Sequence, residues 1–292
     1  MSISESPVDP ALNTGELLKS GCQQLAGVLN LELSTARIEV QCLMQSVLCV
    51  NRAYLFTHPE RILSADERAR YGELLMRRLN GEPIAYLLGQ REFYGLELKV
   101  TPATLIPRPD TELLVELALQ RMPLCCISRV LDMGTGSGAI AIAIAHQRPD
   151  AEVVAVDASE AALNVAEINV QRLQTNNVSL LHSDWFSALD GEHFDIIVSN
   201  PPYIESGDVH LGQGDVRFEP LTALASGTDG LNDMRRIIAD ARAHLVLGGW
   251  LMLEHGYNQS ERVRGLLHQA GFGNVSSVQD LSGIERVTLG SV

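Results

Sequence analysis

The chain has 292 residues, 46% of them hydrophobic, and its mean hydropathy of +0.06 is typical of a globular protein. Its formal net charge at pH 7 is −14, and residues 89–292 hold most of it, with 26 acidic and 14 basic residues. Proteins that hold a phosphate backbone usually carry a basic face. The charge balance therefore argues against nucleic acid as the main ligand.

No segment predicts export or membrane insertion. The N-terminal stretch MSISESPVDP is polar and acidic, and the apolar run from Ala139 to Ala145 is too short to span a bilayer. The cysteines are odd in number and form no C-x-x-C pair; they are Cys22, Cys42, Cys49, Cys125 and Cys126. We expect reduced thiols, a cytoplasmic location and, because the histidines are scattered, no metal site.

Residues 1–88 predict a small helical domain. Apolar residues recur at helical spacing, as in Leu17, Leu18, Cys22, Leu25 and Leu29. Ser64 and Glu67 form a capping-box pattern, and Gly81 marks the end of the helix that follows it. Because no reactive side chains cluster here, we expect this domain to support the rest of the chain or to recognise a substrate.

Residues 89–105 predict a linking β-hairpin, since β-prone residues flank Gly95. From residue 106 to 292, strands and helices alternate. The expected strands are RVLDM (129–133), EVVAVD (152–157), VSLLH (178–182), FDIIVSN (194–200), GGWLMLEH (248–255) and VTLG (287–290). The expected helices are one that Asp110 or Thr111 caps, then 138–147, 159–173, 230–246 and 258–270. This alternation predicts an α/β fold with a doubly wound, mostly parallel sheet.

A glycine-rich turn, DMGTGSG (132–138), lies between the first expected strand of this domain and the helix that follows. Gly134, Gly136 and Gly138 allow a tight turn and close approach of a ligand to the backbone. Asp157 ends the second strand, where a carboxylate can accept both hydroxyl groups of a ribose. Strand, glycine turn, helix, strand and terminal aspartate together predict a nucleoside-binding site.

The glycine spacing G-x-G-x-G differs from the G-x-G-x-x-G of dinucleotide-binding proteins. It favours S-adenosylmethionine, which has no pyrophosphate for a helix N-terminus to bind. After the third strand, Asp184 is placed to meet the adenine amine and Trp185 to stack on the ring.

The stretch SNPPY (199–203) follows the fourth strand. In a doubly wound sheet that strand neighbours the first, so Asn200 is expected to face the glycine loop across the ligand-binding crevice. Asn200 offers a side-chain carbonyl, and Pro201 offers a backbone carbonyl without a competing N–H donor. Pro202 restricts the direction of that carbonyl.

Two fixed acceptors match the two N–H bonds of a planar –NH2 group. Hydrogen bonds to both N–H groups raise the electron density on the nitrogen and aim it at an electrophile, here a sulfonium methyl group. Tyr203 is placed to stack on the planar group. We therefore predict methyl transfer to an amide or amine nitrogen.

These motifs resemble class I S-adenosylmethionine-dependent methyltransferases that act on amino groups. Three further stretches, IPRPDTE (106–112), VRFEPLTAL (216–224) and LEHGYNQ (253–259), make the chain similar to the protein-(glutamine-N5) methyltransferases of peptide chain release factors. The resemblance covers almost the whole chain. It implies a seven-stranded sheet, an N-terminal substrate-recognition domain, and methylation of the glutamine in the Gly-Gly-Gln loop of release factors.

The resemblance also implies roles for individual residues. Asn200 and Pro201 would bind the glutamine amide, with Pro202 and Tyr203 beside it. The cofactor, which leaves as S-adenosylhomocysteine, would be held by Gly134, Thr135, Gly136, Ser137, Gly138, Asp157, Asp184, Trp185 and Asn200. We expect a monomer with no metal, no membrane and no nucleic-acid partner. The loop from Pro107 to Glu112 would wall the active site, and residues 204–230 would form a mobile flap over the substrate.

Three other functions compete with this one. A methyltransferase of an adenine or cytosine exocyclic amine in nucleic acid would use the same NPPY chemistry on a flipped base, but the acidic charge argues against it. A nicotinamide-dependent oxidoreductase is disfavoured by the glycine spacing and by NPPY. A non-catalytic binding module would be favoured by loss of Asn200, which is present.

Overall fold

A computed structural model describes residues 12–123 and 126–292. The N-terminal stretch MSISESPVDP and Cys125 lie outside the described residues. The chain forms two compact units. The first comprises residues 1–89 and 212–218, and the second comprises residues 90–211 and 219–292.

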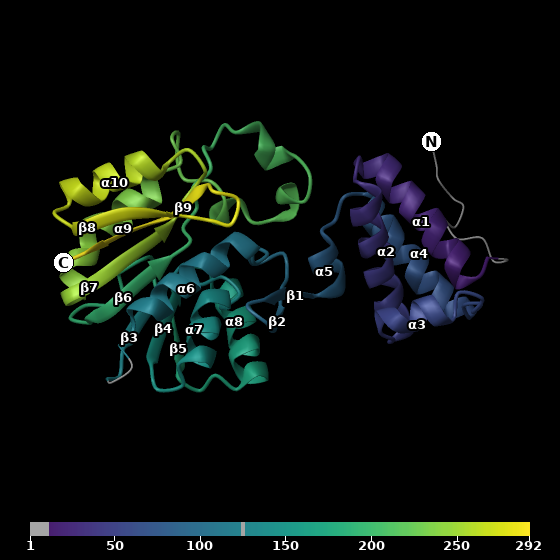
Figure 1. The fold of residues 1–292 in the computed structure, drawn as a ribbon, viewed down its shortest axis with the longest axis horizontal. Helices are drawn as coiled ribbons and strands as arrows, with labels where there is room; N and C mark the ends of the chain where they lie inside the picture. Colours follow the sequence, from purple (N-terminus) through teal and green to yellow (C-terminus); the bar gives the residue numbers. More distant parts are fainter. Residues whose placement is uncertain (1–11, 124–125) are drawn as a thin grey trace. The chain divides into compact units, whose positions relative to one another are not determined.

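Among its described residues, the helical unit contains five α-helices around its own apolar core. These are α1 (Thr14–Leu29), α2 (Leu33–Leu48), α3 (Arg52–Thr57), α4 (Ala65–Leu79) and α5 (Ile84–Leu88) (Figure 1). The predicted capping box begins α4, where the Ser64 side chain accepts from the Glu67 N–H and the Glu67 carboxylate accepts from the Ser64 N–H. Tyr71 is fully buried in the core. The helical domain predicted from the periodicity is therefore present.

A distant segment, residues 212–218, also belongs to the helical unit. Arg78 is buried and pairs with Glu39 at 2.7 Å and with Asp215 at 2.9 Å. Arg217 donates to the backbone carbonyl of Asn80 at 2.7 Å. A buried arginine needs such partners, because an unpaired charge is costly inside a protein. The middle of the predicted 204–230 flap is thereby fixed to α4 and α2.

The second unit begins with the predicted hairpin, formed by β1 (Gln90–Phe93) and β2 (Leu96–Lys99). Asn169 is completely buried and holds the end of this hairpin. Its Oδ1 accepts from the Lys99 N–H at 2.7 Å, and its Nδ2 donates to the carbonyls of Lys99 and Ser137, both at 2.9 Å. One amide side chain thus joins the hairpin to the glycine loop.

The main sheet has seven strands in the order β5-β4-β3-β6-β7-β9-β8, in which β9 is antiparallel to β7 and β8 and the other neighbouring pairs are parallel. The strands are β3 (Arg129–Met133), β4 (Glu152–Asp157), β5 (Val178–His182), β6 (Phe194–Ser199), β7 (Leu245–Glu254), β8 (Gly273–Gln279) and β9 (Glu285–Ser291). The predicted doubly wound sheet is confirmed. The sequence pattern did not locate β8, because this edge strand is largely polar and no residue in it is buried.

Helices cover both faces of the sheet (Figure 1). They are α6 (Glu112–Arg121), α7 (Ala139–Gln147) and α8 (Glu160–Leu173), which pack into one apolar cluster, and α9 (Asn232–Ala241) and α10 (Ser260–Gln269), which pack into another. Strand residues alternate between the clusters: Val130 faces the first and Leu131 the second. Short 3₁₀ turns lie at Pro109–Thr111, Val209–Gly212, Val216–Phe218, Leu221–Ala223 and Arg242–His244. Within the described ranges no helix is long and apolar enough to cross a membrane.

We predict that Asn169→Ala destabilises the second unit, because it leaves three backbone groups without their buried partner. A loss of about 2–4 kcal/mol in the free energy of unfolding is expected in urea titrations. Asn164→Ala is the matched control, since Asn164 lies exposed on the same helix. Equal stability of the two variants would contradict the assigned role.

Candidate active site

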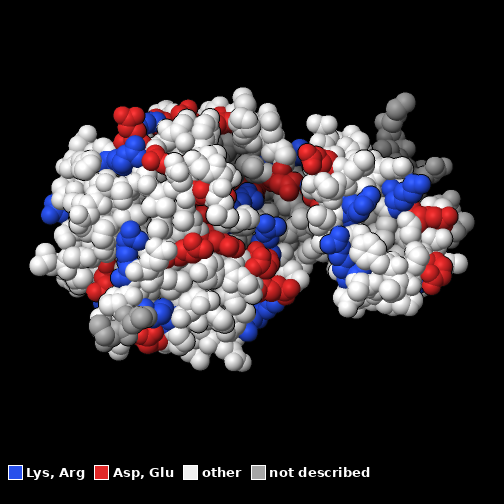
Figure 2. All heavy atoms as spheres, viewed as in Figure 1, with Lys and Arg blue, Asp and Glu red and all other residues white. Residues whose placement is uncertain are grey.

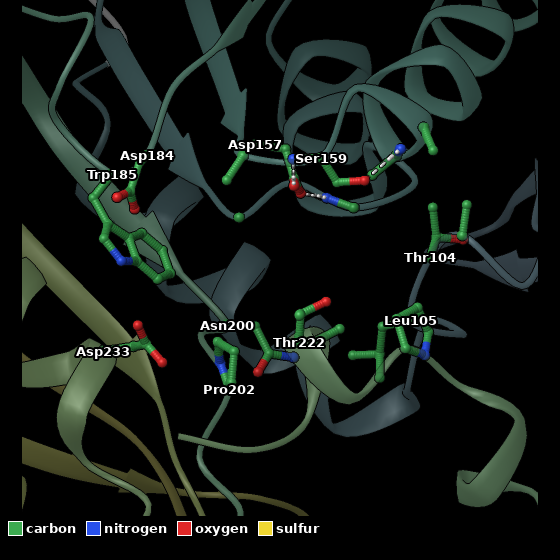
Figure 3. Close-up of a pocket in the computed structure, with 18 of the residues that line it drawn as sticks. Thr104, Leu105, Asp157, Ser159, Asp184, Trp185, Asn200, Pro202, Thr222 and Asp233 are labelled. Carbon is green, nitrogen blue, oxygen red and sulfur yellow. Dashed lines mark hydrogen bonds between the residues drawn. The ribbon is translucent and has the colours of Figure 1, made fainter. Parts of the chain in front are cut away.

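The carboxyl ends of β3, β4 and β6 open into a cavity with a volume of about 640 Å³. Figure 3 shows Asp157 and Ser159 on one side, Asn200, Pro202 and Thr222 across from them, and Trp185 with Asp184 at one end. The order of strands reverses between β3 and β6, which is where doubly wound sheets bind their ligands.

The glycine loop forms part of the cavity wall through Gly134 and Gly136. Both have positive φ values, of 71° and 56°, which residues with a Cβ rarely adopt. A Cβ built on Gly136 meets no protein atom within 4 Å. It would project into space that a ligand can occupy, so the absence of a side chain here leaves a cradle for the cofactor.

The Asp157 carboxylate lies beside this cradle at the end of β4. Its Oδ2 accepts from the Gly136 N–H at 2.9 Å and its Oδ1 from the Ser159 N–H at 2.8 Å. These bonds orient the group, and each oxygen keeps lone-pair capacity for a further donor. A pair of ribose hydroxyls is such a donor, so the residues present fit the adenosyl group of S-adenosylmethionine.

Asp184 and Trp185 lie in the cavity wall, as the sequence predicted. Arg236 pairs with the Asp184 carboxylate at 2.8 Å. Trp185 packs against the apolar cluster behind it, and its φ is positive at 51°. That conformation is uncommon for a bulky residue and marks a backbone that the surrounding loop constrains.

The remaining loop residues, Thr135, Ser137 and Gly138, are not in the cavity wall. The buried Thr135 hydroxyl donates to Asp132 at 2.6 Å, and the Ser137 carbonyl accepts from Asn169. Gly138 precedes α7 with a φ of 84°. These three residues shape the loop from behind, and their direct contact with the cofactor stays a prediction.

The NPPY residues divide between the cavity and the core. Asn200 and Pro202 line the cavity, whereas Pro201 is buried and Tyr203 packs against the second apolar cluster. The Tyr203 hydroxyl lies 3.4 Å from Glu254 Oε1. Stacking of Tyr203 on the substrate therefore stays a prediction, and the structure adds a hydrogen-bonding role toward Glu254.

Asn200 has a hydrogen-bond partner that the sequence did not reveal. Its Nδ2 donates to the Thr111 hydroxyl at 3.1 Å, which leaves Oδ1 as the group available to a ligand. Thr111 stands at the N-cap position of α6, as predicted, but makes no capping bond there. The prediction that Asp110 or Thr111 caps this helix is wrong, because both residues belong to the 3₁₀ turn Pro109–Thr111 that leads into α6, and neither makes a capping bond there.

Glu254, at the end of β7, is buried beside the Tyr203 hydroxyl. Burial raises its pKa to about 7, and the nearby Asp110 acts in the same direction, while hydrogen bonds from Thr111 and Tyr203 and the charge of Arg286 lower it. A buried carboxyl group with a pKa this high is common at functional sites. No motif argument had singled out Glu254, although it lies in the stretch LEHGYNQ.

The loop from Pro107 to Glu112 is tied to Glu219, which lies within the predicted 204–230 flap. Glu219 is buried, pairs with Arg108, and accepts from the Ile106 N–H at 2.9 Å. The predicted flap contributes Thr222, Ala223 and Ala225 to the cavity wall. Residues that the sequence did not predict also line the cavity: Pro102, Ala103, Thr104, Leu105, Ala158, Ser159, Asp233 and Arg236. Most lie in loops, where no periodicity marks them.

A glycine loop, a strand-end aspartate and an asparagine acceptor around one cavity define a class I S-adenosylmethionine-dependent methyltransferase. Residues 109–215 match the family model of the methyltransferase small domain, and residues 16–89 match that of the PrmC N-terminal domain. A solved 16S rRNA methyltransferase of T. thermophilus, in complex with AdoMet and guanosine, is 25% identical with a TM-score of 0.51, covering 69% of this chain and 49% of that chain.

Curated relatives are far more similar. The release factor glutamine methyltransferase of Pseudomonas aeruginosa is 52% identical over 256 residues, which cover 88% of this chain and 92% of that protein. The Escherichia coli protein of the same name is 50% identical over 255 residues, covering 87% of this chain and 91% of the relative. This chain belongs to the family of release factor glutamine methyltransferases.

We predict that S-adenosylhomocysteine changes the fluorescence of Trp185, because we expect its adenine to bind in the cavity that this ring lines. The chain has 2 tryptophans, and the other, Trp250, lies under the Arg121 guanidinium, 4.7 Å from its ring centroid. A titration of Trp250→Phe should show the spectral change, and a titration of Trp185→Phe should not. A change that survives in Trp185→Phe would place the nucleoside elsewhere.

We also predict that Glu254 makes stability fall as pH rises. Its pKa of about 7 in the folded state exceeds the ordinary value of 4.5, so folding takes up a proton between these values. The free energy of unfolding of the wild type should therefore decline relative to Glu254→Gln between about pH 4.5 and 7 and run parallel above it. Urea titrations across this range measure the difference, and parallel curves throughout would refute the pKa shift.

Proposed function

We propose that this protein transfers a methyl group from S-adenosylmethionine to the side-chain amide nitrogen of the glutamine in the Gly-Gly-Gln loop of peptide chain release factors. One observation carries the proposal. Asn200 lines the same cavity as Asp157 and the glycine loop, and its Nδ2 is bonded to Thr111, which leaves Oδ1 to accept from a ligand. This arrangement supports an acceptor for an –NH2 group opposite the proposed nucleoside site. The named activity of the relatives supports the same substrate.

The proposed chemistry depends on orientation. An amide nitrogen is a poor nucleophile because its lone pair is delocalised into the carbonyl group. Asn200 Oδ1 and the Pro201 carbonyl would accept one N–H bond each, which increases the electron density on nitrogen and directs it toward the methyl group. S-adenosylmethionine supplies that methyl group on a positively charged sulfur. As the new N–C bond forms, the bond between sulfur and the methyl carbon would break and S-adenosylhomocysteine would leave. The nitrogen, which then carries positive charge, would lose one proton to solvent or a nearby acceptor.

Preorganised acceptors of this type can contribute several kcal/mol to catalysis. The cavity residues Gly134, Gly136, Asp157, Asp184 and Trp185 would hold the cofactor, and Thr135, Ser137 and Gly138 would shape the loop. Tyr203 and Pro202 would keep the substrate amide in register. Among the described residues no cluster of His, Cys, Asp and Glu could hold a metal ion, and our proposal includes none.

The main alternative is an exocyclic amine of a nucleic acid base. Residues 89–292 carry a net charge of −12, with 26 acidic and 14 basic residues. On the face that Figure 2 shows, acidic and basic side chains of the described residues are interspersed without a continuous basic stripe. Nucleic acids bind strongly to basic surfaces, so this distribution favours a protein substrate.

We further propose that the helical domain, predicted as residues 1–88, recognises the release factor and that residues 89–105 link it to the catalytic domain at 106–292. Residues 16–89 match the family model of the PrmC N-terminal domain, which supports a role for this domain that is separate from catalysis. We expect the enzyme to act as a monomer in the cytoplasm, where release factors work during translation.

The decisive test incubates the protein with S-adenosylmethionine and, in separate reactions, full-length release factor, DNA and RNA. Mass spectrometry should find one added methyl group on the glutamine of the release factor and none on nucleic acid. Methylated nucleic acid with unmodified release factor would overturn the assignment.

We predict that Asn200→Ala lowers the rate of transfer to the release factor by about 100-fold or more, because one acceptor for the amide is lost. S-adenosylhomocysteine should still bind measurably by calorimetry. Asn164→Ala, an exposed asparagine of α8, serves as the control and should retain activity. Retained turnover in Asn200→Ala would mean that another group holds the amide.

A further inference from the structure

We infer that Thr111 and Glu254 are positioning residues that decide which end of the Asn200 side-chain amide faces the substrate. The inference rests on the proposed function, since it assigns Asn200 Oδ1 the task of accepting a substrate N–H. It concerns residues from three separate elements: Asn200 follows β6, Thr111 precedes α6, and Glu254 ends β7.

The Asn200 side chain has two ends of opposite hydrogen-bonding character. Its Oδ1 only accepts and its Nδ2 only donates, and the two ends have nearly the same size. Rotation by half a turn would replace the acceptor by a donor that repels the N–H bonds of the substrate amide. Shape alone cannot prevent this rotation, so a hydrogen-bond partner has to select the orientation.

Thr111 is that partner, because its hydroxyl lies 3.1 Å from Asn200 Nδ2. A hydroxyl can either accept from Nδ2 or donate its proton to Oδ1, and it has one proton to give. The useful orientation of Asn200 therefore requires that the Thr111 proton point elsewhere. Thr111 is 4% exposed, so water does not compete freely for that proton.

Glu254 provides the other acceptor for the Thr111 proton. The Thr111 side chain lowers the pKa of the Glu254 carboxyl group, as a proton donated to it would, and this group is 2% exposed. Tyr203 donates to Oε1 at 3.4 Å, and burial raises the pKa of the Tyr203 hydroxyl, which keeps it a donor. Glu254 Oε2 is buried and has no hydrogen-bond partner among the described residues, so it can accept a further proton donor.

The hydrogen bonds among these residues then have one consistent set of donors and acceptors. Tyr203 and Thr111 donate to Glu254, Thr111 accepts from Asn200 Nδ2, and Asn200 Oδ1 is left for the substrate. If Glu254 is replaced by an apolar residue, the Thr111 proton can turn to Oδ1 and stabilise the wrong orientation of the amide. Loss of Glu254 should thus lower kcat through its effect on the Thr111 hydroxyl, although Glu254 does not line the cavity.

The local structure around Thr111 leaves its hydroxyl available for this role. A threonine that caps a helix has non-helical φ and ψ, and its hydroxyl bonds the backbone of the first turn. Thr111 closes the 3₁₀ turn Pro109–Thr111 with a helical φ of −67° and ψ of −18°, and its side chain makes no capping bond. Its hydroxyl bonds Asn200 instead.

The test compares Glu254→Met, Glu254→Gln, Thr111→Val, Thr111→Ser and the double variant Glu254→Met/Thr111→Val on full-length release factor at pH 8. This pH lies above the Glu254 pKa of about 7, so the carboxyl group of the wild type only accepts hydrogen bonds. We expect kcat to fall about 10- to 100-fold in Glu254→Met and Thr111→Val, with little change in KM, because most release factor contacts are untouched. Thr111→Ser and Glu254→Gln keep the hydroxyl and an acceptor, and should stay within about 3-fold of wild type.

The double variant separates positioning from general structural damage. If Glu254 acts through the Thr111 proton, Glu254→Met should cost nothing further once that proton is absent in Thr111→Val. Additive losses in the double variant, or full activity in Glu254→Met, would overturn the inference. Inactivity of the wild type on release factor would instead refute the proposed function, so the two failures are distinguishable.

Two controls complete the design. Thr175→Val removes another buried threonine hydroxyl, which has no hydrogen-bond partner and is likewise 4% exposed, and it should leave kcat unchanged. The affinity for S-adenosylhomocysteine should be close to wild type in every variant that is compared, and melting temperatures at pH 8 measure the stability of each variant. A loss of kcat that follows the loss of stability across the series, with Thr175→Val included, would refute positioning.

Discussion

The parallel pairing of β3 with β6 is the constraint on which the site depends. Met133 lies opposite Ser199 in this ladder, and the Ser199 hydroxyl donates to the Met133 carbonyl at 2.7 Å inside the protein. Both strands therefore end at the same level, so the glycine loop and Asn200 emerge side by side. A shift of register by one residue would turn the side chains of β6 to the opposite face of the sheet. The glycine loop and Asn200 are therefore close together because the register of β3 and β6 is fixed.

Much of this arrangement could be predicted from the sequence, for physical reasons. Buried parallel strands such as β3 and β4 are short apolar runs, and α8 shows clear helical periodicity. Parallel topology then brings the carboxyl ends together at one edge, so Asp157 and Asn200 could be assigned to one crevice without coordinates. The seven-stranded sheet and the methyltransferase family are confirmed. The polar edge strand β8 carries no such signal and was not located.

Other parts of the site depend on contacts that local patterns do not encode. Thr111 and Asn200 are 89 positions apart, and Ile106 and Glu219 are 113 positions apart. The cavity wall at Thr104 and Leu105 belongs to a loop, where proximity decides function and periodicity is absent. The segment 212–218 is a further case, because its place with the helical unit rests on a buried pairing of Arg78 with Asp215.

The conflict between local and global demands is clearest at Thr111. Helix-capping rules predict that its hydroxyl bonds the first turn of α6, yet the hydroxyl faces Asn200 and Glu254. Sequence rules that describe stability fail where a side chain is used for something else. Glu254 fits the same pattern, since burial of a carboxyl group costs stability and has raised its pKa. Thr111 and Glu254 thus each reduce local stability, and each contacts a residue of NPPY: Thr111 contacts Asn200, and Glu254 contacts Tyr203. This loss of stability is explained if Thr111 and Glu254 together hold the Asn200 side-chain amide in a single orientation.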